Sequence, residues 1–258
     1  MQTKDRPVGI FDSGVGGLTV VKEIIKLLSH EDIIYFGDTA RVPYGTRSTQ
    51  TIRRFSEESI EFLLKKKVKC VVIACHTVSA VSGRYLKRKY SDICLFDVVT
   101  PVLKKLAKSK EKIGVIGTRA AIGSGIYSNL NKVTQVACPL FVPFIEEGEV
   151  DGELIYKLTK RYLGKLKVDT LVFGCTHYPI IEKTIKKVLP NTNLINPGVL
   201  VSEDLKSFLK ESNLLNNQKK KSTRKYYVSD LNERFTNVAK LFLDDNLKLN
   251  LTKVKADK

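Results

Sequence analysis

Two segments of the chain carry the same pattern, a short apolar run that ends in a cysteine. Residues 71–75 read Val-Val-Ile-Ala-Cys, and residues 171–175 read Leu-Val-Phe-Gly-Cys. Runs of this kind are typical of buried strands. In both segments a histidine and a threonine follow the cysteine within two residues. We therefore expect Cys75 and Cys175 to face each other, and two facing thiols can remove a proton from one side of a carbon and return it from the other.

The rest of the chain alternates strand-like runs with apolar residues at helical spacing. Strands are expected at residues 8–11, 33–36 and 70–74, and such a βαβαβ series predicts a parallel sheet with helices on both faces. The pattern begins again at residues 113–118, where Ile-Gly-Val-Ile-Gly-Thr echoes Val-Gly-Ile-Phe-Asp-Ser at residues 8–13. The expected fold class is α/β, with two pseudo-symmetric lobes, each a mainly parallel sheet flanked by helices, and an active site in the cleft between them.

This repeat divides the chain near residues 96–101. The first α/β lobe is expected to hold residues 1–97 plus 207–258, and the second lobe residues 98–206. The placement of the C-terminal segment against the first lobe rests in part on the resemblance described below. The tail alternates as an edge strand does, at Leu247, Leu249 and Leu251.

The chain has a large excess of basic residues. It holds 44 lysines and arginines against 27 aspartates and glutamates, a formal net charge of +17. Such an excess can mark a nucleic-acid partner, because basic side chains displace the counterions of phosphate. Here the lysines are spread along nearly every expected helix, and no recognition-helix motif accompanies them. The pattern argues against nucleic acid and favours a solvated basic surface that also attracts an anionic small substrate.

The cysteine content indicates a reducing compartment. Five cysteines without CxxC spacing argue against a disulfide framework, and Cys70, Cys94 and Cys138 are expected to be inert core residues. The polar start of the chain shows no signal peptide. No apolar run approaches the roughly 20 residues that span a bilayer. We therefore expect a cytoplasmic protein without a membrane partner.

Five of the expected strands end in small or polar residues. Ligands of open α/β sheets bind beyond the carboxyl ends of the strands, so these ends are expected to converge in one cleft. Each cysteine is also expected to precede a helix, at residues 79–89 and 179–188, and a helix N-terminus favours the thiolate over the thiol. Asp12, Glu146 or His177 would then hold or relay the proton. The five strand ends are residues 12–14, 37–38, 75–77, 117–118 and 175–177.

Two other uses of these residues compete with acid–base chemistry. Residues 14–17 read Gly-Val-Gly-Gly, but the spacing of a dinucleotide-binding loop fails and no acidic ribose ligand follows at the expected offset. Cys75, His76, Cys175 and His177 could build a tetrahedral zinc site. Adjacent residues after a strand point in different directions, so ligation by both Cys75 and His76 is awkward. We expect neither a cofactor nor a metal.

Several segments, in chain order, resemble the signature segments of the bacterial glutamate racemases, in the aspartate/glutamate racemase superfamily. They cover nearly the whole chain to about residue 201. The Asp-Ser-Gly-Val-Gly-Gly and Gly-Cys-Thr-His-Tyr-Pro segments are the most specific. The matching segments are residues 11–18, 37–39, 43–45, 74–77, 117–118, 139–148 and 174–179.

The resemblance implies a cofactor-independent racemisation of glutamate that supplies D-glutamate for peptidoglycan. Cys75 would take the α-proton from D-glutamate and Cys175 from L-glutamate, with the opposite thiol donating. Asp12 would assist Cys75, and His177 and Glu146 would assist Cys175. Oligomeric state varies in the family, and a homodimer is one state that it allows. The positions that would hold the substrate are Ser13, Pro43, Tyr44, Gly45, His76, Thr77, Thr118 and Thr176.

Two positions depart from the family pattern. The family usually has asparagine where this chain has His76, a larger ring that can become cationic. It usually has threonine where this chain has Ala121, and the missing hydroxyl would leave a substrate carboxylate short of a partner, at a cost of about 1–3 kcal/mol. Two alternatives follow: a racemase for aspartate or another amino acid in the same superfamily, or a catalytically weakened member that acts as a binding protein.

Overall fold

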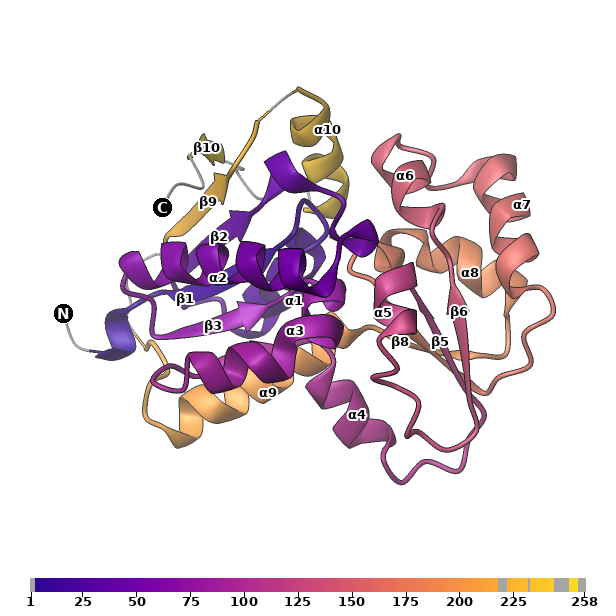
Figure 1. The fold of residues 1–258 in the computed structure, drawn as a ribbon, viewed down its shortest axis with the longest axis horizontal. Helices are drawn as coiled ribbons and strands as arrows, with labels where there is room; N and C mark the ends of the chain where they lie inside the picture. The colour runs from indigo at the N-terminus through magenta and orange to yellow at the C-terminus, as the bar shows by residue number, and fades with distance from the viewer. Residues whose placement is uncertain (1–2, 218–221, 232, 244–250, 255–258) are drawn as a thin grey trace.

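The chain forms two parallel sheets that lie side by side, each flanked by helices (Figure 1). The computed structural model describes residues 3–217, 222–231, 233–243 and 251–254. The larger sheet has the strand order β10-β9-β2-β1-β3-β4, and the smaller sheet has the order β6-β5-β7-β8. The strands of the larger sheet are β1 (Val8–Asp12), β2 (Ile33–Gly37), β3 (Cys70–Ile73), β4 (Leu95–Asp97), β9 (Arg224–Val228) and β10 (Leu251–Lys253). Those of the smaller sheet are β5 (Ile113–Gly117), β6 (Val133–Ala137), β7 (Thr170–Gly174) and β8 (Asn193–Ile195).

The helices alternate with the strands along the chain. Short 3-10 helices lie at Thr3–Asp5 (η1), Thr39–Arg41 (η2), Tyr44–Thr46 (η3) and Tyr178–Ile181 (η4). The helices of the first half are α1 (Leu18–Leu27), α2 (Thr49–Lys65), α3 (His76–Lys89), α4 (Thr100–Leu106) and α5 (Arg119–Gly123). Those of the second half are α6 (Phe141–Glu146), α7 (Gly152–Leu163), α8 (Glu182–Val188), α9 (Pro197–Glu211) and α10 (Glu233–Phe242).

The predicted duplication is visible in the strand order. The series β2-β1-β3-β4 in one sheet is matched by β6-β5-β7-β8 in the other, and every described pairing is parallel. All residues of the central strands β1, β3, β5 and β7 are buried. Burial of both faces requires apolar runs rather than alternation, which is why these segments read as continuous β-branched stretches. The α/β fold class is therefore confirmed.

The C-terminal segment extends the first sheet. β9 pairs with β2, and β10 pairs with β9 at the sheet edge. Of the alternating tail, Leu247 and Leu249 lie outside the described residues. The expected boundary between residues 206 and 207 falls inside helix α9. This helix packs on α1 and α4 as well as on β7. The residue ranges assigned to the two lobes remain a prediction.

Most helices carry basic residues at their C-terminal end. The last turns of α1, α2, α3, α4, α7, α8, α9 and α10 all carry lysine or arginine. Cations at this end interact favourably with the helix dipole. Helices that connect parallel strands end at the edge of the sheet opposite the strands' carboxyl ends. The lysines and arginines of these last turns therefore lie away from the edge where parallel sheets bind ligands.

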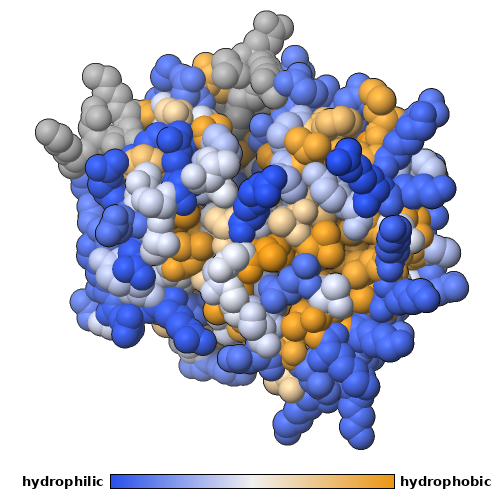
Figure 2. All heavy atoms as spheres, turned by 45° about the vertical axis from the view of Figure 1, so that its right-hand side comes forward, coloured by the Kyte–Doolittle hydropathy of each residue, from blue (hydrophilic) through white to orange (hydrophobic). Residues whose placement is uncertain are grey.

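The surface is otherwise mixed. On the face that Figure 2 displays, hydrophilic residues dominate the periphery and apolar residues gather toward the middle. Leu140 and Leu154 are among the exposed large apolar side chains. None of the described helices combines the length and apolar character needed to cross a membrane. Cys70 and Cys138 are buried as expected, but Cys94 is exposed, because it lies just before the short strand β4, whose first residues are only half-buried.

A buried ion pair joins segments that are far apart in the sequence. Lys69 Nζ lies 2.5 Å from Glu31 Oε2, and the two side chains are 0% and 1% exposed. Lys69 also donates to the carbonyl oxygens of Lys4 and Leu214, at 2.9 and 2.8 Å. The pair thus ties the N-terminal turn and the segment after α9 to the start of β3.

We predict that Lys69→Met lowers the free energy of unfolding by about 3–5 kcal/mol, because it leaves the Glu31 carboxylate buried without its cation. Urea denaturation measures this change. The double variant Lys69→Met/Glu31→Gln should recover part of the loss, since no buried charge remains. Lys104→Met is the control, because the Lys104–Asp204 pair is 70% and 37% exposed and should shift stability by no more than about 1 kcal/mol. Equal losses in Lys69→Met and the double variant would contradict this account.

Candidate active site

A cavity of about 410 Å³ lies between the two lobes. Its walls come from the carboxyl ends of β1, β3, β5 and β7 and from the loops that follow them. Asp12 does not line it and instead lies buried at the end of β1. The cavity-lining residues that the sequence had singled out are Ser13, Pro43, Tyr44, Gly45, Cys75, His76, Thr77, Thr118, Glu146, Cys175, Thr176 and His177.

The two cysteines differ in the helices that follow them. Helix α3 begins at His76, directly after Cys75, and not at residue 79 as expected. Cys75 therefore sits at the N-terminus of a 14-residue helix, the positive end of its dipole. After Cys175 the 3-10 helix η4 comes first, and α8 begins only at Glu182. Pro179 lies in the first turn of η4, so the helix expected from residue 179 begins as a 3-10 helix and continues directly as α8.

Cys75 is held as a thiol. Its sulfur lies 3.3 Å from the hydroxyl oxygen of Ser13. Burial, together with the nearby charge of Asp12, raises the pKa of Cys75 to about 12, although the Ser13 hydrogen bond opposes the shift. Asp12 accepts the backbone N–H of Gly14 at 2.9 Å, and burial raises the pKa of its carboxyl group. A buried carboxylate beside this thiol makes loss of the Cys75 proton costly.

Cys175 lies beside a cationic ring. Its sulfur is 3.7 Å from His177 Nδ1, and His177 Nε2 is 2.9 Å from a carboxylate oxygen of Glu146. Burial alone would lower the pKa of His177, but the hydrogen bonds to Cys175 and Glu146 outweigh it and raise the pKa to about 10. The ring is therefore an imidazolium at neutral pH. A positive charge at this distance stabilises negative charge on the sulfur.

His177 also contacts the first lobe and the C-terminal segment. Its ring lies edge-to-face against Phe242 of α10, with centroids 5.3 Å apart. On another side it comes so close to Gly16 that a Cβ at that position would overlap the ring and the Thr176 side chain. Glycine is therefore required here, which explains part of the glycine-rich segment before α1.

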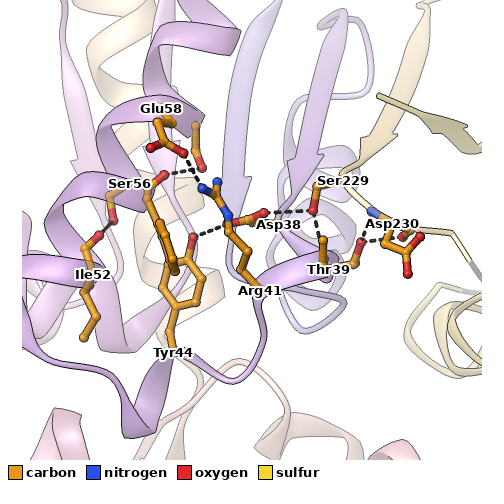
Figure 3. A network of polar contacts seen from close by, with 12 residues as sticks. Asp38, Thr39, Arg41, Tyr44, Ile52, Ser56, Glu58, Ser229 and Asp230 are labelled. Atoms are coloured by element: carbon orange, nitrogen blue, oxygen red, sulfur yellow. Dashed lines mark hydrogen bonds and ion pairs between the residues drawn. The ribbon is translucent and has the colours of Figure 1, made fainter. Parts of the chain in front are cut away.

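The loop that carries Pro43, Tyr44 and Gly45 is held by the network in Figure 3. Asp38 is fully buried and accepts hydrogen bonds from Arg41 Nε at 2.6 Å, the Tyr44 hydroxyl at 2.5 Å and the Ser229 hydroxyl at 2.8 Å. The sequence had placed Asp38 at a strand end facing the cleft, but its carboxylate binds this loop instead.

The same network reaches two other elements. Arg41 pairs with Glu58 of α2 (Figure 3). Its guanidinium also lies over the Phe55 ring, 4.1 Å from the ring centroid. The Thr39 hydroxyl donates to the carbonyl of Asp230, directly after β9. The loop is thus fixed both to α2 and to the C-terminal segment, a connection that no motif in the sequence marked.

Contacts across the cleft come from paired side chains. The hydroxyls of Thr77 and Thr118 are 3.0 Å apart, and they belong to α3 and to the residue that caps α5. The backbone N–H of Ala121 donates to the Thr118 hydroxyl at 3.2 Å. Ala121 itself is buried and is not one of the residues that line the cavity.

His76 is neutral. It is 2% exposed, and burial lowers its pKa to about 4 against a smaller opposing effect of Asp97. The expectation that this ring can become cationic is therefore wrong at physiological pH. Its Nε2 lies 2.5 Å from the hydroxyl oxygen of Tyr127, a residue that sequence reasoning missed.

Both nitrogen atoms of His177, and Nε2 of His76, already have partners. His177 faces Cys175 and Glu146, and His76 Nε2 faces Tyr127. Across the described part of the chain, no group of three or more histidine, cysteine, aspartate or glutamate side chains is arranged to hold a metal ion. The geometry instead offers two sulfurs with unequal surroundings on the walls of one cavity.

Comparison with known proteins points in the same direction. The model of the Asp/Glu/Hydantoin racemase family matches residues 10–201. A glutamate racemase from Aquifex aeolicus is 42% identical over 254 residues, which is 95% of this chain and 97% of that protein. One from Chlorobaculum parvum is 40% identical over 254 residues and 93% of each chain.

Solved structures agree in fold. The crystal structure of glutamate racemase from Francisella tularensis in complex with D-glutamate has a TM-score of 0.92 at 39% identity and covers 98% of this chain and 99% of that one. The enzyme from Thermus thermophilus, in complex with beta-chloro-D-alanine, has a TM-score of 0.91 at 35% identity over 98% of both chains. With the family model spanning both cysteines and these relatives covering nearly all of its length, the chain belongs to the Asp/Glu/Hydantoin racemase family.

Proposed function

We propose that the protein is a glutamate racemase that interconverts L- and D-glutamate at Cα without a cofactor. The observation that carries the proposal is the pair of sulfurs, Cys75 and Cys175, on the walls of one cavity with unequal partners. Relatives at about 40% identity are glutamate racemases, and a structural neighbour binds D-glutamate. We further propose a cytoplasmic role in supplying D-glutamate for peptidoglycan.

In the direction from L- to D-glutamate, Cys175 acts as the base. Its thiolate takes the α-proton, and the electron pair of the broken C–H bond stays on the substrate as a carbanion. Cys75 then donates its thiol proton to the opposite face, which forms the new C–H bond and leaves Cys75 as a thiolate. The imidazolium of His177 supports the starting thiolate, and the high pKa of Cys75 keeps its proton in place.

The reverse direction starts from a Cys75 thiolate and a Cys175 thiol. Asp12, buried beside Cys75, then supports the acid–base exchange on that side. Unequal surroundings are what this chemistry needs, because one sulfur must hold a proton while the other does not.

The substrate is held between the lobes. Hydroxyl groups from both sides, among them Ser13, Thr77, Thr118 and Thr176, line the cavity and offer donors to carboxylate oxygens. Pro43, Tyr44 and Gly45 close the first-lobe side through the loop that Asp38 anchors. Fixed donors in the cleft also stabilise the negative charge that develops when the α-proton leaves.

We predict that in D₂O without added cofactor the protein introduces deuterium at Cα of both L- and D-glutamate. Cys75→Ser and Cys175→Ser should each slow racemisation by about 10²–10⁴-fold, because each removes one proton-transfer group. Proton NMR of the α-hydrogen follows the exchange. Cys94→Ser is the matched control, since Cys94 is exposed and does not line the cavity.

Three outcomes would overturn this function. Exchange of aspartate but not of glutamate would indicate a racemase of different specificity. Exchange of neither, with binding of glutamate retained, would indicate a binding protein. Full activity in either cysteine variant would exclude the two-base mechanism.

We predict that Glu146→Gln moves the alkaline limb of kcat/KM for L-glutamate to lower pH. The pKa of His177 is raised to about 10, so its cationic form is present below that pH and is lost as pH rises through it. Removal of the carboxylate lowers this pKa toward the ordinary value near 6.5. The positive charge that stabilises the Cys175 thiolate is then lost at a lower pH. Glu149→Gln, an exposed residue outside the cavity, is the control. An unchanged alkaline limb in Glu146→Gln would show that Glu146 does not hold the charge.

A further inference from the structure

Tyr127 contacts the residue beside Cys75 from the opposite lobe. It lies between α5 and β6, its side chain is fully buried, and its hydroxyl oxygen is 2.5 Å from Nε2 of His76. The two rings are stacked, with centroids 5.8 Å apart and planes at 24°. His76 is the first residue of α3 and lines the cavity. The contact therefore joins the lobes next to one of the two sulfurs.

The direction of this hydrogen bond follows from burial. The Tyr127 hydroxyl keeps its proton, because burial, with a smaller effect of Asp97, raises its pKa well above the ordinary value. Within the described residues, His76 is the partner found for this hydroxyl. If the hydroxyl accepted from His76, its own proton would be buried without an acceptor, which costs about 1–3 kcal/mol. Tyr127 therefore donates, and Nε2 of His76 accepts.

This direction decides the tautomer of His76. Burial lowers the pKa of His76 to about 4, so the ring is neutral. A neutral imidazole whose Nε2 accepts carries its proton on Nδ1. Asp97 does not compete for that proton, because its carboxylate is bound by Lys87, by the Thr100 hydroxyl and by backbone N–H groups.

We propose that Tyr127 is a positioning residue that holds the His76 ring in one orientation and one tautomer, so that an Nδ1–H donor is available to the bound amino acid beside Cys75. The inference rests on the proposed function for its substrate, an α-amino acid that brings a carboxylate acceptor. Tyr127 also explains how a histidine can stand at position 76, where the family usually has asparagine. An asparagine amide offers a donor without further support, whereas a histidine offers one only if its tautomer is held, and Tyr127 holds it.

We predict that Tyr127→Phe raises KM for glutamate roughly 3–10-fold, the effect of one weakened hydrogen bond, with a smaller change in kcat. In the His76→Asn background the same Tyr127→Phe change should leave KM unaltered, because no tautomer remains to be held. This double-mutant cycle separates positioning from packing. Tyr90→Phe is the matched control, since its hydroxyl binds Glu61 on an exposed surface, 3.2 Å away, and KM should not move.

Nitrogen-15 NMR of the histidine rings tests the inference without relying on activity. The wild-type protein should show His76 as the Nδ1–H tautomer, and Tyr127→Phe should show a mixture. A wild-type Nε2–H tautomer would overturn the inference even if the protein racemises glutamate. An equal rise of KM in both backgrounds would also overturn it, because Tyr127 would then act through packing alone. Loss of racemisation in the wild type with the Nδ1–H tautomer present would instead count against the proposed function.

Discussion

The hydrogen bonds from His177 to Cys175 and Glu146 make the two sides of a duplicated fold chemically different. The strand series β2-β1-β3-β4 of the larger sheet is matched by β6-β5-β7-β8 in the smaller one, so the backbone alone would place two equivalent thiols on the cavity walls. The imidazolium beside Cys175 and the buried carboxylate beside Cys75 remove that equivalence. Proton transfer across the cavity depends on this difference between the two sulfurs, because two equal thiols would both be protonated at neutral pH.

Burial shifts the pKa of Cys75 and the pKa values of the two histidines in opposite directions. It raises the pKa of Cys75 and lowers that of His76, since both groups lose hydration of their charged forms. His177 is also buried, yet two hydrogen-bond partners reverse the outcome. Depth in the structure therefore does not by itself set the charge of a side chain, because hydrogen-bond partners can outweigh the effect of burial.

The C-terminal segment takes part in the cleft although its strands lie at the far edge of the first sheet. Ser229 binds the Asp38 carboxylate that holds the Tyr44 hydroxyl, and Phe242 packs against the His177 ring. The C-terminal segment thus contacts both the loop on the first-lobe side and the imidazolium on the second-lobe side. A change in the packing of this segment would therefore affect both sides of the cavity.

The sequence by itself determined the α/β class, the repeat and the convergence of strand ends. A parallel sheet that is buried on both faces requires continuous apolar runs, which can be recognised in the sequence. The carboxyl ends of such strands meet at one edge of the sheet. It also marked the two cysteines through their matching surroundings. Only the tertiary structure decided the start of α3 at His76, the burial of Asp38 away from the cleft, and the Tyr127 contact. These three features depend on which side chains, distant in the sequence, pack beside His76 and Asp38. No local pattern of residues predicts those contacts.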